Sequence, residues 1–278
     1  MIETKELAKE AIEIRKRTLE IIHDAPGGHT GGSLSAVDIL TVLYFKVMRI
    51  DPLRFDDPNR DRFIMSKGHS VEGYYSALAR RGFIADSLLD TYGNFNSVLA
   101  GHPTRKIPGV ELNSGALGHG LSVGVGMALA AKRQHKDFRT FVLMGDGEHG
   151  EGSIMEAASA AGHYKLDNLV AIIDRNMLQI SGPTEEIMSI GDIGKKYEAC
   201  GWTVAEVDGH DLEALIDVFS HIPKEQGKPT FVIAHTIKGK GVSFIENKAA
   251  WHHRVPTEEQ LKEAINELNK KKEAIENG

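Results

Sequence analysis

Apolar residues along the chain follow two patterns, continuous runs and helical spacing. Short continuous runs, typical of strands buried on both faces, predict strands at 63–65, 140–144, 169–173, 202–207 and 230–234. Apolar residues recurring every three or four positions predict helices near 3–24, 35–48, 71–81, 119–135, 152–163, 192–199, 211–220 and 257–276. This alternation indicates an α/β fold, a parallel sheet with helices on both faces. Because no repeat or Pro-rich linker interrupts it, we predict one domain over residues 1–278.

Composition narrows the class of protein. Hydrophobic residues make up 41% of the 278 residues and charged residues 26%, which is ordinary for a globular protein. The net charge of -6 disfavours binding to a nucleic-acid backbone. The single cysteine, Cys200, excludes an internal disulfide and a cysteine metal site. Charged residues stand where a signal peptide needs an apolar core, and no apolar run is long enough to cross a membrane. We therefore predict a cytoplasmic protein with no nucleic-acid or membrane partner.

Polar residues follow two of the predicted strands at the point where each strand ends. Gly145, Asp146 and Gly147 follow one strand, and Asn176 follows the next, thirty residues after Asp146. This spacing fits one β-α-β crossover, which places both side chains at the rim where parallel sheets bind ligands. One carboxylate and one carboxamide are oxygen ligands suited to Mg²⁺. Taken alone, the Gly-Asp-Gly segment also fits a tight turn with Asp146 as a helix cap; the second polar cluster favours the metal.

Two ligands are too few for a complete magnesium site made of protein atoms. Mg²⁺ normally completes its coordination with water and with phosphate oxygens of a bound ligand. Gly145 and Gly147 would let the backbone approach those oxygens, and the helix start after them would supply N–H groups. The pattern therefore predicts a site for a metal and a diphosphate group.

Short segments distributed from about residue 5 to residue 260 extend this pattern to most of the chain. They include the predicted glycine-rich loop 28–33 and the segments 66–69, 101–103, 108–111, 115–120, 145–148, 164–169, 174–176, 238–241 and 251–252. In this order they resemble the N-terminal part of transketolases. The chain is most similar to the forms in which this part is a separate chain. The resemblance implies thiamine diphosphate and Mg²⁺ as cofactors.

The resemblance also implies roles for individual residues. Asp146 and Asn176 would bind Mg²⁺ through their side chains, and Leu178 through its backbone carbonyl. The residues expected to bind or surround thiamine diphosphate are His69, Gly115, Leu117, Gly147, Glu151, Asp174, Asn176 and Lys238. Among them, Lys238 is a point charge suited to phosphate oxygens, and Glu151 would join a carboxylate network that reaches the neighbouring active site.

Four histidines match the family's active-site positions. His29, His69, His102 and His252 all lie in or beside glycine-containing loops. Sugar hydroxyls and developing alkoxides need hydrogen-bond donors and acceptors tunable near neutral pH, which suits imidazole. We assign His29 and His252 to proton handling, and His69 and His102 to the donor's oxygens and the cofactor end. A zinc cluster is a poor alternative because no two histidines have the short helical spacing of zinc enzymes.

The chain departs from the family pattern at a few positions. Thr30 stands where proline is frequent, and Met155 where tryptophan is frequent. His253 and Arg254 replace a frequent Gly-Lys pair, so the resemblance leaves a phosphate contact by Arg254 open. The roles of His119 and His149 are open too.

The resemblance implies that the second and third transketolase domains are absent from this chain, and with them the glutamate that activates the cofactor's aminopyrimidine. We therefore expect a separate C-terminal subunit with the site at the interface, and a heterotetramer of two plus two chains. The expected reaction moves a two-carbon ketol unit from a ketose phosphate to an aldose phosphate. Alternatives are the first component of a 2-oxo acid dehydrogenase, a ketol transferase acting on another sugar, and a non-catalytic module that binds a metal and a diphosphate.

Overall fold

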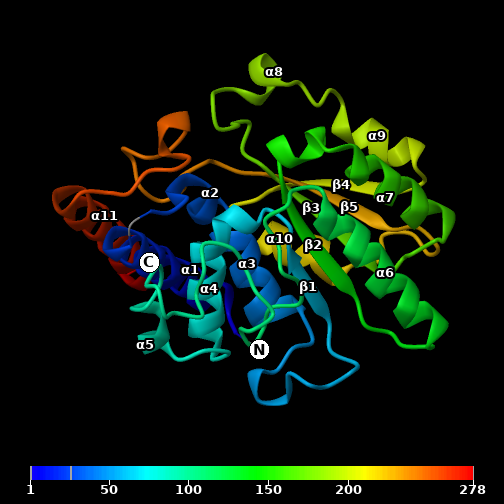
Figure 1. The fold of residues 1–278 in the computed structure, drawn as a ribbon, viewed down its shortest axis with the longest axis horizontal. Coiled ribbons are helices and arrows are strands. Elements are labelled where there is room, and N and C mark those ends of the chain that lie inside the picture. Colours follow the sequence, from blue (N-terminus) through cyan, green and yellow to red (C-terminus); the bar gives the residue numbers. More distant parts are fainter. Residues whose placement is uncertain (1, 26, 278) are drawn as a thin grey trace.

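The computed structural model describes residues 2–25 and 27–277, which form five parallel strands and surrounding helices (Figure 1). The strands lie in the order β1-β2-β3-β5-β4. Their bounds are β1 Arg62–Met65, β2 Thr140–Gly145, β3 Leu169–Arg175, β4 Thr203–Asp208 and β5 Thr230–His235. All four pairings are parallel, so the predicted α/β fold with a parallel sheet is confirmed.

Successive side chains of the central strands pack on opposite faces of the sheet. On β2, Phe141 and Leu143 belong to one core, whereas Val142 and Met144 belong to the other. This alternation follows from the two-residue period of a strand, and both sets are apolar because helices cover both faces. A continuous apolar run is therefore what a central strand of this sheet requires.

The path of the chain explains which helix covers which face. The chain moves from β2 through α7 to the neighbouring β3, and later from β4 through α10 back to β5 in the opposite direction across the sheet. Since both crossovers are expected to be right-handed, α7 and α10 should lie on opposite faces. Apolar residues of α7 indeed pack in one core and those of α10 in the other.

The helices form two layers around the sheet (Figure 1). The face that contains α10 Leu212–Ser220 is also covered by α1 Thr4–Asp24, α3 Val37–Val42 and α4 Val71–Arg81. The other face is covered by α6 His119–Arg133, α7 Gly152–His163 and α9 Ile193–Ala199. The C-terminal helix α11 Glu258–Asn277 packs against α1. The remaining α-helices are α2 Thr30–Ser35, α5 Asp86–Leu89 and α8 Thr184–Ile187, and α8 stands out from the body on a long loop. The π-helix is η1 Leu43–Val47, and the 3-10 helices are η2 Pro52–Arg54, η3 Gly68–Ser70, η4 Gly147–Gly150 and η5 Ala249–Trp251.

The prediction of a loop over 28–33 is wrong for most of that segment. Helix α2 begins at Thr30 and includes both central glycines. A Cβ atom on Gly31 would lie 2.9 Å from Cγ of Lys238, and one on Gly32 would lie 2.7 Å from Oγ of Ser70. The glycines therefore allow close packing of a helix, rather than the left-handed turn that glycine often signals. The single helix predicted near 35–48 is also divided, into the end of α2, then α3, and the π-helix at 43–47.

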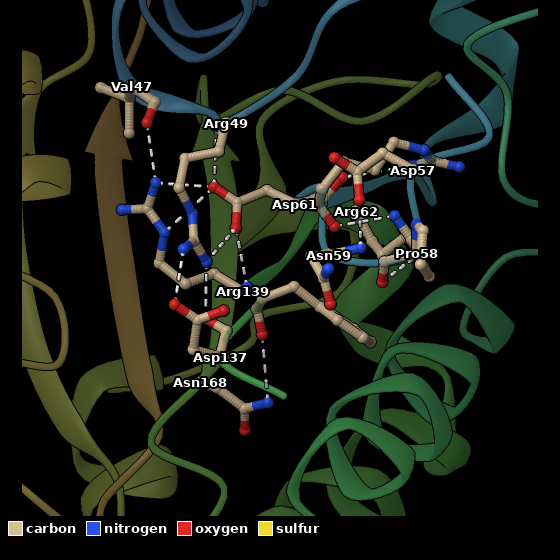
Figure 2. A network of polar contacts seen from close by, with 12 residues as sticks. Val47, Arg49, Asp57, Pro58, Asn59, Asp61, Arg62, Asp137, Arg139 and Asn168 are labelled. Atoms are coloured by element: carbon tan, nitrogen blue, oxygen red, sulfur yellow. Dashed lines mark hydrogen bonds and ion pairs between the residues drawn. The ribbon is translucent and has the colours of Figure 1, made fainter. Parts of the chain in front are cut away.

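A network of charged side chains closes the amino-terminal edge of the sheet (Figure 2). Asp61 is fully buried and precedes β1. Its carboxylate accepts hydrogen bonds from the backbone N–H of Arg49 at 3.0 Å and of Arg139 at 2.8 Å, and forms ion pairs with both guanidinium groups. Arg49 also pairs with Asp137. The network joins the loop before β1 to the start of β2, so it stabilises the edge opposite to the one where ligands bind in such sheets.

None of the helices in the described ranges 2–25 and 27–277 is long and apolar enough to cross a membrane.

Candidate functional site

A cavity of about 490 Å³ opens at the carboxyl ends of β2 and β3. Ten of the residues predicted for the site line it: His29, His69, Gly115, Leu117, Asp146, Gly147, Asn176, Leu178, Lys238 and His252. They come from segments far apart in the sequence, and the parallel sheet brings them to one rim, as expected for open sheets of this kind.

The turn after β3 wraps around the Asp146 carboxylate. Oδ2 of Asp146 accepts a hydrogen bond from the backbone N–H of Met177 at 2.7 Å, and Oδ1 forms an ion pair with Arg175. Met177 adopts a left-handed backbone conformation with φ 62°, which is costly for a residue with a side chain. Oδ1 of Asn176 accepts from the N–H of Leu178 at 3.2 Å. This strained turn places oxygens of Asp146, Asn176 and Leu178 on the same cavity wall.

Two lysines bring positive charge to the cavity. Lys238 is only 2% exposed, and its Nζ donates to the carbonyl of Leu178 at 3.3 Å and to Nδ1 of His252 at 2.9 Å. Within the described part of the chain, no carboxylate lies within ion-pair distance of Lys238. Burial, together with the charge of Lys67, lowers the pKa of Lys238 to about 8, so its ammonium group still predominates at pH 7. A buried cation without a carboxylate partner favours an anionic ligand.

The second lysine is half of a buried ion pair beneath the cavity floor. Lys67 pairs with Asp174 and also donates to the carbonyl of Gly32 at 3.0 Å. Asp174 additionally accepts from Oγ of Ser35 at 2.6 Å and from Oγ of Thr236. Burial alone would raise the pKa of Asp174, but the Lys67 charge and these hydrogen bonds lower it. The pair ties together the loop after β1, helix α2, strand β3 and the segment after β5.

Three histidines meet at one side of the cavity. The ring of His29 lies 5.2 Å from that of His69 and 5.6 Å from that of His252, measured between centroids. Burial, reinforced by nearby positive charge, lowers the pKa of His29 to about 4, of His69 to about 2 and of His252 to about 3. All three rings are therefore neutral at pH 7. Because an ammonium group can only donate, Nδ1 of His252 accepts from Lys238 and its ring proton lies on Nε2.

Three predicted site residues do not line the cavity. His102 is exposed and packs behind Gly115, where an added Cβ would lie 2.8 Å from its Cδ2. Glu151 is exposed at the start of α7 and packs against Gly118. Asp174 is buried in its ion pair under the floor. Direct contact of these three residues with a ligand stays a prediction.

Several residues of the cavity wall were not predicted. Lys67 stood out in the sequence only as part of a motif, although its position directly after a strand was a signal for the rim. Glu148 accepts from the N–H groups of Gly118 at 3.0 Å and Gly145 at 3.1 Å. The other additions are Gly32, Gly145, Gln179, Ile180, Ser181 and Ile187. The last four belong to the loop that carries α8, which has no periodic pattern in the sequence.

The residues present fit a divalent metal and a diphosphate group. The cavity offers two side-chain oxygens and one carbonyl oxygen of the kind that Mg²⁺ binds, beside the unpaired cation of Lys238. Gly145 and Gly147 expose backbone on the same wall, and a Cβ on Gly147 would face the side chain of Gln179 at 3.5 Å. Asp146 and Asn176 would hold the metal together with the carbonyl of Leu178, and Lys238 would bind phosphate oxygens.

Comparison with known proteins decides the family. Residues 7–274 match the family model described as transketolase, thiamine diphosphate binding domain. The chain belongs to the transketolase family.

Relatives of this transketolase-family chain include both separate subunits and longer enzymes. It is 54% identical to one of the named subunits of apulose-4-phosphate transketolase from Phocaeicola vulgatus, over 99% of this chain and 97% of that protein. It is 42% identical to the 6-deoxy-6-sulfo-D-fructose transketolase subunit SqwG of Clostridium sp., over 95% of this chain and 97% of the relative. The crystal structure of transketolase from Campylobacter jejuni is 31% identical with a TM-score of 0.90, and the match covers 96% of this chain and 43% of that one. The chain thus spans less than half of that longer transketolase.

The three residues whose roles were open lie away from the cavity wall of this transketolase chain. His119 is exposed, and its Nδ1 lies 3.1 Å from the carbonyl of Leu117. His149 is buried, and its Nδ1 hydrogen-bonds the carbonyl of Gly145 at 2.8 Å. Arg254 lies over the ring of Trp251, 4.8 Å from its centroid. His149 therefore supports the turn after β2, and Arg254 is directed onto an aromatic face.

The neutral histidines of the transketolase site predict acid sensitivity. An unfolded histidine titrates near pH 6.5, whereas burial lowers the pKa values of His29, His69 and His252 well below that. From about pH 6.5 down to about pH 4 the unfolded chain binds more protons, so the free energy of unfolding should fall as the pH falls. Denaturant titrations across this range measure the slope. The double variant His29→Asn, His252→Asn should give a shallower slope, and a slope equal to wild type would contradict the assignment.

Proposed function

We propose that this chain is the thiamine diphosphate- and Mg²⁺-binding subunit of a two-chain transketolase. The enzyme would transfer a two-carbon ketol unit from a ketose phosphate to an aldose phosphate. The observation that carries the proposal is the cavity in which the buried, unpaired Lys238 faces the oxygens of Asp146, Asn176 and Leu178. The match to the thiamine diphosphate binding domain of transketolases supports it.

The chain's own residues would bind, orient and move protons. When bound, thiamine diphosphate supplies the electron sink that carbon–carbon bond cleavage needs. Neutral His29 and His252 can each accept or donate a proton at a substrate hydroxyl, and Nε2 of His252 carries the proton available for donation. His69 stacks on His252, with centroids 5.3 Å apart, and restricts its ring orientation.

The partner would be a separate C-terminal transketolase subunit that covers the cavity mouth. Four large apolar side chains near that mouth are exposed in this chain: Met177, Ile180, Ile187 and Met188. Ile180 and Ile187 also line the cavity, so a partner seated there would bury them and complete the site. Relatives named as subunits that cover nearly the whole of this chain support the arrangement. We propose a closed assembly of two plus two chains.

The substrate class is a sugar phosphate or a related sugar acid. The relatives are named for apulose-4-phosphate and for 6-deoxy-6-sulfo-D-fructose, which are sugars that carry an anionic group. We propose that this enzyme also takes a ketose donor with a terminal anion. We keep the cytoplasmic location as part of this proposal.

The test is reconstitution with the chain encoded by the neighbouring reading frame. We expect no ketol transfer from this chain alone, because the second half of the site is missing, and turnover once the partner, thiamine diphosphate and Mg²⁺ are present. A coupled assay with several ketose phosphates and aldose phosphates as substrates measures it. Full turnover by the chain alone would contradict the two-chain proposal. Cofactor binding without turnover in the complex would instead favour a non-catalytic module.

A further inference from the structure

One buried carboxylate near the cavity takes no part in the roles described above. Glu72 is fully buried in the first turn of α4, three residues after His69, and it does not line the cavity. Acidic residues are common in the first turn of a helix, but they normally face water. A carboxylate that is removed from water needs hydrogen-bond partners, so its partners indicate what it holds in place.

The partners of Glu72 are donors from three separate segments. Oε1 accepts from the backbone N–H of His29 at 3.0 Å and from Oη of Tyr92 at 2.8 Å. Oε2 accepts from Oγ of Ser33 at 2.7 Å. His29 is the residue before α2, where backbone N–H groups have no partner within the helix. Glu72 therefore supplies, from another helix, the acceptor that the start of α2 needs.

The packing around this contact leaves the His29 backbone little freedom. A Cβ on Gly73 would lie 2.7 Å from the carbonyl oxygen of Ser33, and one on Gly28 would lie 3.0 Å from Oε1 of Glu72. Helices α2 and α4 are thus in direct backbone contact. Since α4 follows His69 almost at once, a bond from its first turn to the N–H of His29 fixes the two histidines relative to each other.

We infer that Glu72 is a positioning residue: its carboxylate holds the His29 backbone so that the His29 ring stays in place against His69 and His252 for proton handling. The inference rests on the proposed function. A misplacement of about 1 Å of a group that acts on the substrate can lower a rate about 100-fold. A residue with this role should affect turnover much more than cofactor binding, because the oxygens of Asp146 and the cation of Lys238 lie on other segments.

The test compares Glu72→Leu and Glu72→Gln in the assembled two-chain enzyme. Leucine removes every acceptor, so we expect kcat to fall about 10- to 100-fold, while the KM for the ketose and the Kd for thiamine diphosphate stay close to wild type. Glutamine keeps one acceptor oxygen for the His29 N–H, so we expect partial rescue with an intermediate kcat. In the ¹⁵N-histidine-labelled full chain, the imidazole signals of His29 should shift in both variants, more strongly with leucine.

Asp61→Asn is the matched control, because it changes another fully buried carboxylate at the opposite edge of the sheet. It should lower stability and leave kcat unchanged. Wild-type kcat in Glu72→Leu would overturn the inference, and so would a parallel loss of kcat and cofactor affinity. If the leucine variant does not fold, wild-type kcat and unshifted His29 signals in Glu72→Gln would overturn it. If the wild-type complex shows no ketol transfer, the proposed function fails, and the His29 signals still test the positioning role.

Discussion

Replacing Asp146 by alanine should weaken thiamine diphosphate binding in the presence of Mg²⁺ by more than about 100-fold, since residues one shell outside a metal already contribute about 10- to 100-fold. Asp146 supplies the one carboxylate among the three oxygens assigned to the metal, and its Oδ2 also holds the strained turn at Met177. Without it, the metal loses its charged ligand and the turn loses its anchor. Calorimetric titration of the chain and its partner with the cofactor measures the change.

The fold should survive this substitution. Arg175 loses its pair with Asp146 but keeps the one with Glu185, at 2.8 Å, so the cost in stability should be about 1–3 kcal/mol. Glu185→Ala is the matched control, because it removes the other partner of Arg175 and does not touch the cavity wall. Its cofactor affinity should equal that of wild type. Unchanged binding by Asp146→Ala would remove the metal assignment.

Replacing Lys67 by methionine should lower the free energy of unfolding by about 3–5 kcal/mol, because it leaves the buried carboxylate of Asp174 without a counter-ion. Adding Asp174→Asn should restore much of the loss, since the uncompensated charge is then gone. Cofactor affinity should fall as well, because Lys67 lines the cavity and holds the carbonyl of Gly32 in α2. Urea denaturation with a double-mutant cycle measures the stability effect.

Arg60→Met separates stability from function. Arg60 and Glu111 form another buried ion pair, with side chains only 9% and 11% exposed, and neither residue lines the cavity. This control should lose a comparable amount of stability and keep its cofactor affinity. If Lys67→Met were as stable as wild type, the pair with Asp174 would not be what holds the floor of the site together.

The strands and the rim of the site were predictable because each depends on local pattern. A central strand of this sheet is apolar on both faces, so β2, β3 and β5 stand out as continuous apolar runs. Asp146 and Asn176 follow two such runs directly, and parallel strands bring the ends of both to one edge. Short segments were enough to suggest Lys238 and the histidines, and the structure brings His29, His69 and His252 together.

The rest depends on contacts between distant segments, which no local pattern encodes. Glycines at 31 and 32 suggested a loop, yet they serve close packing of α2 against Lys238 and Ser70. Nothing near Glu72 in the sequence indicates that it would bind the backbone of His29, 43 residues away. The positions of His102 and Glu151 relative to a ligand depend on how exposed segments settle in the assembly.

The Asp61 network has a consequence for how this domain diversifies. It holds the amino-terminal edge of the sheet with ion pairs that share no residue with the cavity wall. Loops at the opposite edge can therefore accumulate substitutions, and alter which sugar fits, while the scaffold stays intact. Family members that keep the same architecture but are named for different sugars are what such a separation would produce over time.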